Sequence, residues 1–155
     1  MQVFKKVLLA LFMVLIAIQF IQPDRNISGQ VSPADFIKNY APPARVHVLL
    51  QTACYDCHSN NTRYPWYSRL QPLSWLMAGH IKNGKEKLNF SDFGNLNNRR
   101  QQSKLHEITG SIKDDMMPLT SYKIMHSAAR LSQADKTLLL DWIYQKADSI
   151  SRLSD

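Results

Sequence analysis

The sequence CYDCH at residues 54–58 constrains this chain more than any other feature. It contains the only two cysteines, three residues apart, with a histidine directly behind them. This spacing occurs in three kinds of site: a metal clip, a redox-active pair and a haem attachment site. The rest of the sequence has to decide between them.

A structural zinc site needs four ligands, usually from two short cysteine or histidine pairs. Here no second cysteine pair exists, and the remaining histidines are dispersed singly. A thioredoxin-type pair belongs to a βαβ context, which is missing, and a structural disulfide would leave His58 unexplained. The pattern therefore predicts one covalently bound haem c. Cys54 and Cys57, one helical turn apart, would each bond a vinyl group, and His58 would bind the iron as the proximal metal ligand.

The first 25 residues have the pattern of an export signal. Lys5 and Lys6 precede an apolar run from Val7 to Ile18, and the apolar character ends near Pro23. Because no clear Ala-x-Ala cleavage site follows, we expect an uncleaved signal anchor over residues 1–25, with a cleaved signal as the alternative. Lysines on the cytoplasmic side would place the rest of the protein on the periplasmic side of the bacterial inner membrane.

The rest of the chain is long enough for one domain. We expect a linker and lead-in segment at 26–42 and a haem-binding domain at 43–150. The net charge of +7 comes from 19 Lys and Arg against 12 Asp and Glu. These basic residues are scattered and form no nucleic-acid-binding stripe, so we expect no nucleic acid partner. They fit either a solvated surface or an acidic protein partner.

Hydrophobic periodicity predicts a small all-α domain behind the N-terminal anchor helix. Helices are expected from Pro43 or Ala44 into the cysteine motif, at 72–82 with Gly84 as the stop, at 98–113 and at 132–147. Their apolar faces comprise Val46, Leu49 and Leu50; Leu105, Ile108 and Ile112; and Leu138, Leu139, Trp142 and Ile143. Ser132 and Asp135 resemble a capping box at the start of the last helix.

A six-coordinate haem needs a second axial ligand, and Met117 is our candidate. Pro118 follows it and favours a rigid, extended loop that presents the thioether. The expected metal ligands are therefore His58 and Met117. The order of helix, Cys-x-x-Cys-His motif, helices, Met-Pro loop and final helix looks like the class I cytochrome c pattern. This resemblance implies a small cytochrome c-like helical domain and the same ligand pair. The alternatives are Met116, Met125, His80, His106 and His126.

Three longer motifs make the resemblance narrower: "CHSNNTRYPWY", "HIKNGKEKLNFS" and "MPLTSY…H…ARLS". Together they resemble the bacterial haem-binding domain family of small, membrane-anchored c-type proteins. The resemblance covers most of the chain from Cys54 to Ser132. It implies haem attachment at Cys54, Cys57 and His58 and a distal ligand at Met117.

The residues that follow the motif are harder to assign. They either contact the haem or pack as core and rim: Arg63, Tyr64, Trp66, Tyr67, Arg69 and Trp75. The carbonyl group of Pro65 or Pro72 is a candidate acceptor for His58 Nδ1, the usual way of orienting a ligand histidine.

Three functions fit this sequence. The first is single-electron transfer to redox partner proteins, which His/Met ligation favours because it closes the coordination sphere and raises the potential. The second is a haem-based ligand sensor or peroxidase-like enzyme with a labile distal ligand, and the third an accessory subunit of a membrane complex. No catalytic acid–base pair lies beside the haem motif, so we expect electron transfer and no enzymatic activity.

Overall fold

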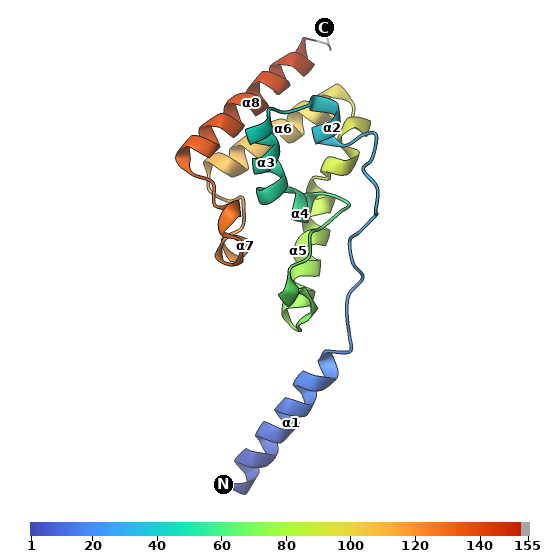
Figure 1. Ribbon diagram of the computed structural model, residues 1–155, viewed down its shortest axis with the longest axis vertical. Helices are drawn as coiled ribbons and strands as arrows, with labels where there is room; N and C mark the ends of the chain where they lie inside the picture. Colours follow the sequence, from blue (N-terminus) through green and yellow to red (C-terminus); the bar gives the residue numbers. More distant parts are fainter. Residues whose placement is uncertain (153–155) are drawn as a thin grey trace.

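The computed structural model describes residues 1–152 as a set of helices joined by short loops (Figure 1). The α-helices are α1 (Gln2–Ile18), α2 (Phe36–Tyr40), α3 (Ala44–Ala53), α4 (Tyr55–His58), α5 (Leu73–Lys87), α6 (Asn98–Lys113), α7 (Thr120–Met125) and α8 (Gln133–Ser151). Three short 3-10 helices complete the set: η1 (Trp66–Arg69), η2 (Phe90–Asn95) and η3 (Ser127–Ala129). Within the described residues there is no strand, only an isolated bridge between Ile27 and Asn61. The expected all-α class is confirmed.

The hydrophobic core lies where α8 crosses α6 and α3 packs against them (Figure 1). Its buried side chains are Phe36, Val46, Leu50, Phe90, Phe93, Leu105, Ile112, Leu139, Trp142, Ile143, Ala147 and Ile150. Phe36 contributes the centre of this cluster, since its ring contacts those of Phe90, Phe93 and Trp142 at centroid distances of 5.1, 4.7 and 5.6 Å. The lead-in segment before residue 43 therefore supplies an aromatic anchor to the core.

The four expected helices are present. α3 buries Val46, Leu49 and Leu50, as its i, i+3, i+4 spacing predicts. α6 has the predicted bounds, and the capping box of Ser132 and Asp135 begins α8. These elements are recoverable from the sequence because an apolar stripe and a capping residue are both local signals.

Two details of these helices differ from expectation. Gly84 does not stop its helix: α5 continues to Lys87, and Gly84 lies inside it, where it faces the backbone of Cys57. Leu138 was expected in the buried stripe of α8, but 40% of its surface is exposed, while Leu139 is fully buried. One of the four residues in this apolar stripe lies at its edge, and periodicity alone does not show which one.

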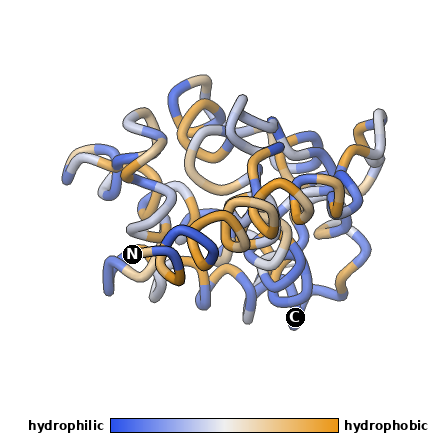
Figure 2. The backbone as a smooth tube through the Cα atoms, turned by 90° about the horizontal axis from the view of Figure 1, so that it is seen from below, coloured by the Kyte–Doolittle hydropathy of each residue, from blue (hydrophilic) through white to orange (hydrophobic). Residues whose placement is uncertain are grey.

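The transmembrane anchor expected over residues 1–25 is not supported. α1 forms, but it ends at Ile18 after 17 residues, which at 1.5 Å per residue span about 26 Å, less than the roughly 30 Å hydrocarbon core of a bilayer. No helix among residues 1–152 is both long and apolar enough to cross a membrane. α1 lies apart from the other helices (Figure 1). Figure 2 shows its apolar character, with a hydrophilic stretch near the start. The sequence has Lys5 and Lys6 in this part of α1.

The extended connection after α1 runs beside α5 and the Cys-x-x-Cys-His motif before it reaches α2 (Figure 1). Asn26 Nδ2 donates to the carbonyl oxygen of Ser59 at 2.7 Å and to Thr62 Oγ1 at 2.9 Å. Nearer to α1, Trp75 Nε1 donates to the carbonyl oxygen of Ile21 at 3.0 Å. The connection is thus fastened to the loop directly behind His58 and to the start of α5.

Candidate functional site

The cysteine motif forms a single helical turn at the end of α3. Cys54 ends α3, and the backbone N–H groups of Cys57 and His58 donate to its carbonyl oxygen at 3.2 and 3.0 Å. Both thiols are free and half-buried. Burial raises the pKa of the Cys54 thiol to about 12, with a smaller contribution from Cys57, and raises that of the Cys57 thiol to about 11, with a smaller contribution from Asp56. Both side chains are therefore neutral thiols at neutral pH.

His58 is held in one orientation by the end of α5. Its Nδ1 donates to the carbonyl oxygen of Leu88 at 3.0 Å, which leaves Nε2 with a free lone pair. Burial lowers the pKa of His58, against the smaller opposing effects of the backbone carbonyl groups of Leu88 and Gly84, so the neutral ring is favoured. The expected acceptors, Pro65 and Pro72, do not fill this role. Leu88 does so because it terminates the helix that packs on the motif.

Gly84 allows α5 to approach the motif closely enough for this contact. A Cβ atom at this position would lie 2.7 Å from the carbonyl oxygen of Cys57, closer than such atoms can pack. The glycine therefore lets α5 pack against the motif helix, so that Leu88, one turn further on, meets His58.

Met117 lies on the loop between α6 and α7, and its backbone N–H donates to the carbonyl oxygen of Ser111 at 3.1 Å. The peptide bond between Met117 and Pro118 is cis. Met117 is half-buried, whereas Met116 is 56% exposed. Of these two adjacent methionines, only Met117 faces the cavities described next.

Two adjoining cavities of about 440 and 130 Å³ lie between the motif, α5 and the Met117 loop. Ala53, His58, Lys87, Met117 and Pro118 border both cavities. The larger one is lined in addition by Cys57, Tyr67, Leu73, Leu76, Met77, His80, Ile81, Gly84, Tyr122, Met125 and His126, among others, and the smaller one by Cys54, Leu88, Phe90, Ile108, Ile112 and Leu131. The four residues expected from the sequence thus line these two largely apolar cavities: His58 and Met117 border both, Cys57 the larger one and Cys54 the smaller one.

The alternative ligands differ in their position relative to the cavities. His106 borders neither cavity. His126 borders the larger one, but both ring nitrogens have partners: Nδ1 donates to the carbonyl oxygen of Tyr122 at 3.2 Å, and Nε2 accepts from Tyr67 at 3.3 Å. His80 and Met125 line the cavity as well. Across the described residues, no group of three His, Cys, Asp or Glu side chains has the arrangement of a metal site.

The family comparison agrees with this geometry. The sequence matches the haem-binding domain family over residues 13–145, which is most of the chain. The chain belongs to this family. No curated protein and no solved structure matches it.

The residues of this haem-binding domain fit the group that the family implies. A ligand histidine needs a free Nε2 and a partner for Nδ1, and His58 has both. A porphyrin needs an apolar space, and the walls of the two cavities supply it. His58 and Met117 are the candidate axial ligands, and the thiols of Cys54 and Cys57 border the same space.

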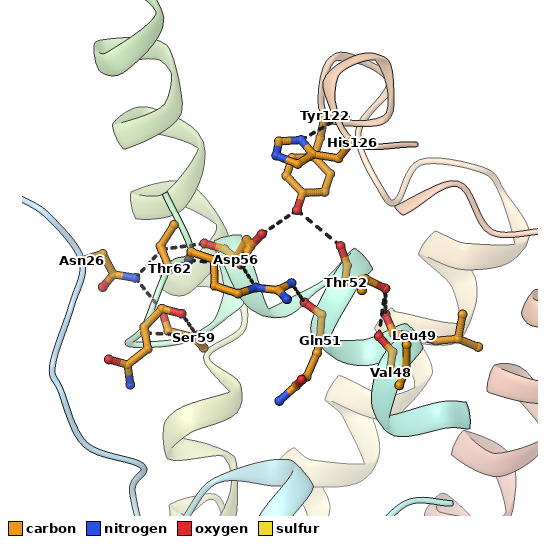
Figure 3. A network of polar contacts seen from close by, with 12 residues as sticks. Asn26, Val48, Leu49, Gln51, Thr52, Asp56, Ser59, Thr62, Tyr122 and His126 are labelled. Atoms are coloured by element: carbon orange, nitrogen blue, oxygen red, sulfur yellow. Dashed lines mark hydrogen bonds and ion pairs between the residues drawn. The ribbon is translucent and has the colours of Figure 1, made fainter. Parts of the chain in front are cut away.

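A buried carboxylate connects the parts of this haem-binding domain (Figure 3). Asp56, between the two cysteines, is only 7% exposed. It accepts hydrogen bonds from the backbone N–H and Nε of Arg63, at 3.2 and 3.1 Å, and from the hydroxyl group of Tyr122 at 2.7 Å. Its own backbone carbonyl accepts from Thr62 at 2.6 Å. The haem motif is therefore bonded to the loop behind it and to α7.

Sequence reasoning missed Leu88, Asp56 and Tyr122, and left the aromatic residues after the motif open. Tyr67 is buried and lines the larger cavity, and Arg63 pairs with Asp56. Trp66 is 79% exposed. The only available signal for the missed network was an acidic residue inside the Cys-x-x-Cys motif, which needs a partner if buried.

Proposed function

We propose that this haem-binding domain is a mono-haem c-type cytochrome that transfers single electrons. Haem would be attached through Cys54 and Cys57 and ligated by His58 and Met117. The observation that supports this most is the shared space: His58, with its free Nε2, and Met117 border the same two cavities, and each cysteine borders one of them.

Electron transfer is favoured by the chain's own ligand set. When bound, haem supplies a one-electron couple, whose potential a thioether ligand raises. Met117 is held from the α6 side through Ser111, and the loop brings it to the cavity that His58 borders. A distal position filled by the protein's own side chain leaves no place for a substrate, so we propose no enzymatic activity.

We propose that the domain works outside the cytoplasm, on the periplasmic side of the bacterial inner membrane, where c-type haem attachment takes place. Lys5 and Lys6, followed by the apolar residues of α1, match the order of an export signal. We therefore assign α1 the role of an export signal.

The proposed partners are redox proteins with an acidic docking surface. Arg63 and Lys87 lie at the larger cavity and are exposed, and the net charge of the chain is +7. Basic residues around the cavity would orient an acidic partner toward the haem edge and increase its association rate.

Optical spectroscopy of the exported protein tests this proposal. The ferric form is expected to show the long-wavelength sulfur-to-iron band, and the ferrous form is expected not to shift on addition of carbon monoxide. Denatured protein is expected to keep its haem, because the attachment is covalent. A high-spin spectrum with ready carbon monoxide binding would instead support a ligand sensor or a peroxidase-like enzyme. Loss of haem on denaturation would exclude the c-type attachment.

A further inference from the structure

The α7 helix follows Met117 closely and has little to hold it in place. It begins at Thr120, and none of its described side chains is buried. Ile124 and Met125 are 67% and 53% exposed. Apolar burial therefore contributes little to fixing this helix, and its position depends on a few polar contacts.

The strongest of these contacts is made by Tyr122. Its hydroxyl group donates to Asp56 Oδ2 at 2.7 Å and lies 3.3 Å from the carbonyl oxygen of Thr52 (Figure 3). The ring of Tyr122 stacks on that of His126 with a centroid distance of 4.0 Å and an interplanar angle of 19°. A bond from a hydroxyl group to a buried carboxylate is among the stronger hydrogen bonds in proteins.

This contact joins opposite sides of the site. Asp56 lies between Cys54 and Cys57 on the haem motif, whereas Tyr122 lies five residues after Met117. On the other flank, the backbone N–H of Met117 is bonded to Ser111 at the end of α6. The loop that carries Met117 is thus fastened on both sides, and on one side it is fastened to the haem motif itself.

We propose that the Tyr122–Asp56 hydrogen bond is a clasp that keeps the Met117 loop closed over the haem site and sets how readily an added ligand takes the distal position. This inference rests on the proposed function, in which Met117 is the distal ligand. Tyr122 and Asp56 are positioning residues: they act through the loop and need no contact with the iron.

The test is the rate at which imidazole binds to the ferric, haem-loaded protein. Tyr122→Phe keeps the ring and its stacking on His126 and removes only the hydroxyl group. Since a hydrogen bond to a charged acceptor typically changes an equilibrium about tenfold or more, we expect imidazole to bind about tenfold faster. Tyr55→Phe is the matched control. On the core side of the same motif, its hydroxyl group donates to Asp35 at 3.2 Å and accepts from the backbone N–H of Ile37 at 3.1 Å. Its rate is expected to equal that of the wild type.

A double-mutant cycle shows whether the clasp acts through Met117. In a Met117→Ala background the distal position is already open, so Tyr122→Phe is expected to have no further effect on the rate. Hydrogen exchange of the haem-free protein gives an independent measurement. The backbone amides of α7 are expected to exchange faster in Tyr122→Phe than in Tyr55→Phe.

Each outcome decides a separate claim. If Met117→Ala has the spectrum and binding rate of the wild type, the distal assignment in the proposed function is wrong. If Met117→Ala opens the site but Tyr122→Phe binds imidazole at the wild-type rate, only the clasp is overturned. An equal rate increase in both backgrounds also overturns it, since the effect then bypasses Met117. Should Tyr122→Phe accumulate without haem, Asp56→Asn replaces it, with a smaller increase expected because the acceptor remains but its charge is lost.

Discussion

Gly84 and Cys57 pack backbone against backbone, with room for a hydrogen atom but not for a methyl group. A Cβ atom on Gly84 would lie 2.7 Å from the carbonyl oxygen of Cys57 and 3.3 Å from its carbonyl carbon. The obstacle is a backbone atom of a tight helical turn, which cannot rotate away as a side chain can. The position of α5 relative to the haem motif, and with it the bond from His58 to Leu88, depends on this glycine.

Gly84→Ala is therefore expected to destabilise the protein, although alanine is the better helix former. Overpacking of this kind costs about 1–3 kcal/mol, more than the roughly 1 kcal/mol gained in helix propensity. The measurement is urea unfolding together with the haem content of the exported protein, and both stability and loading are expected to fall.

Gly79 provides the matched control on the same helix. No heavy atom lies within 4 Å of a Cβ atom built there, so Gly79→Ala is expected to stabilise the protein by up to about 1 kcal/mol. If both alanine variants behaved alike, close packing on Cys57 would not be the role of Gly84.

Met117→Ala and Met116→Ala are expected to differ sharply despite being neighbours. Only Met117 faces the cavities, while Met116 is 56% exposed. Loss of the thioether ligand lowers the reduction potential, since methionine ligation raises it. The expected result is a lower potential and loss of the sulfur-to-iron band for Met117→Ala, with wild-type values for Met116→Ala. The reverse pattern would move the distal ligand by one residue.

Local signals in the sequence predict most of this fold. The bounds of α6 and the capping box of α8 depend on residues that are close to one another in the chain. The Cys-x-x-Cys-His motif, which includes His58, is a local signal of the same kind. The choice of Met117 over Met116 also rested on a local signal, the proline that follows it. The cavities are bordered by Met117 and not by Met116.

What the sequence did not reveal depends on how helices pack. Leu88 meets His58 across 30 positions of sequence, and Tyr122 meets Asp56 across 66. Gly84 has the local appearance of a helix stop, and only the close approach of α5 to Cys57 explains why a glycine occupies this position inside the helix. Such contacts follow from tertiary geometry, for which a single sequence carries no periodic signal.

The capping box of α8 predicts a pH dependence of stability. Asp135 accepts from the hydroxyl group of Ser132 at 2.7 Å and from Arg45 on α3 at 2.6 Å. The Ser132 hydrogen bonds and the Arg45 guanidinium hold the pKa of Asp135 below its usual value. A carboxylate whose pKa is lowered by folding stabilises the protein above its unfolded pKa, about 3.9, and loses this effect as pH falls through the folded value.

Asp135→Asn is accordingly expected to lower the melting temperature at pH 7, and the difference from the wild type is expected to shrink below about pH 4. Thermal unfolding followed by circular dichroism, at a series of pH values from about 2.5 to 7, measures this difference in melting temperature. Asp141→Asn, an exposed position on the same helix, is the charge-matched control and is expected to stay near the wild type. A difference that persists unchanged at the lowest pH would show that the carboxylate charge is not what stabilises the cap.

Leu138 and Leu139 are adjacent on α8 and chemically identical, and the structure assigns them different energetic roles. Leu139 is fully buried against the core around Phe36 and Trp142, whereas 40% of the surface of Leu138 is exposed. Removing a buried leucine side chain loses its transfer free energy and leaves a cavity, which together cost about 2–5 kcal/mol. We therefore expect Leu139→Ala to lower the free energy of unfolding by about that amount in urea titrations. Leu138→Ala is expected to cost less than about 1 kcal/mol, because its site is partly solvated already and leaves no closed cavity. Equal losses for the two variants would mean that α8 is rotated relative to the packing described above.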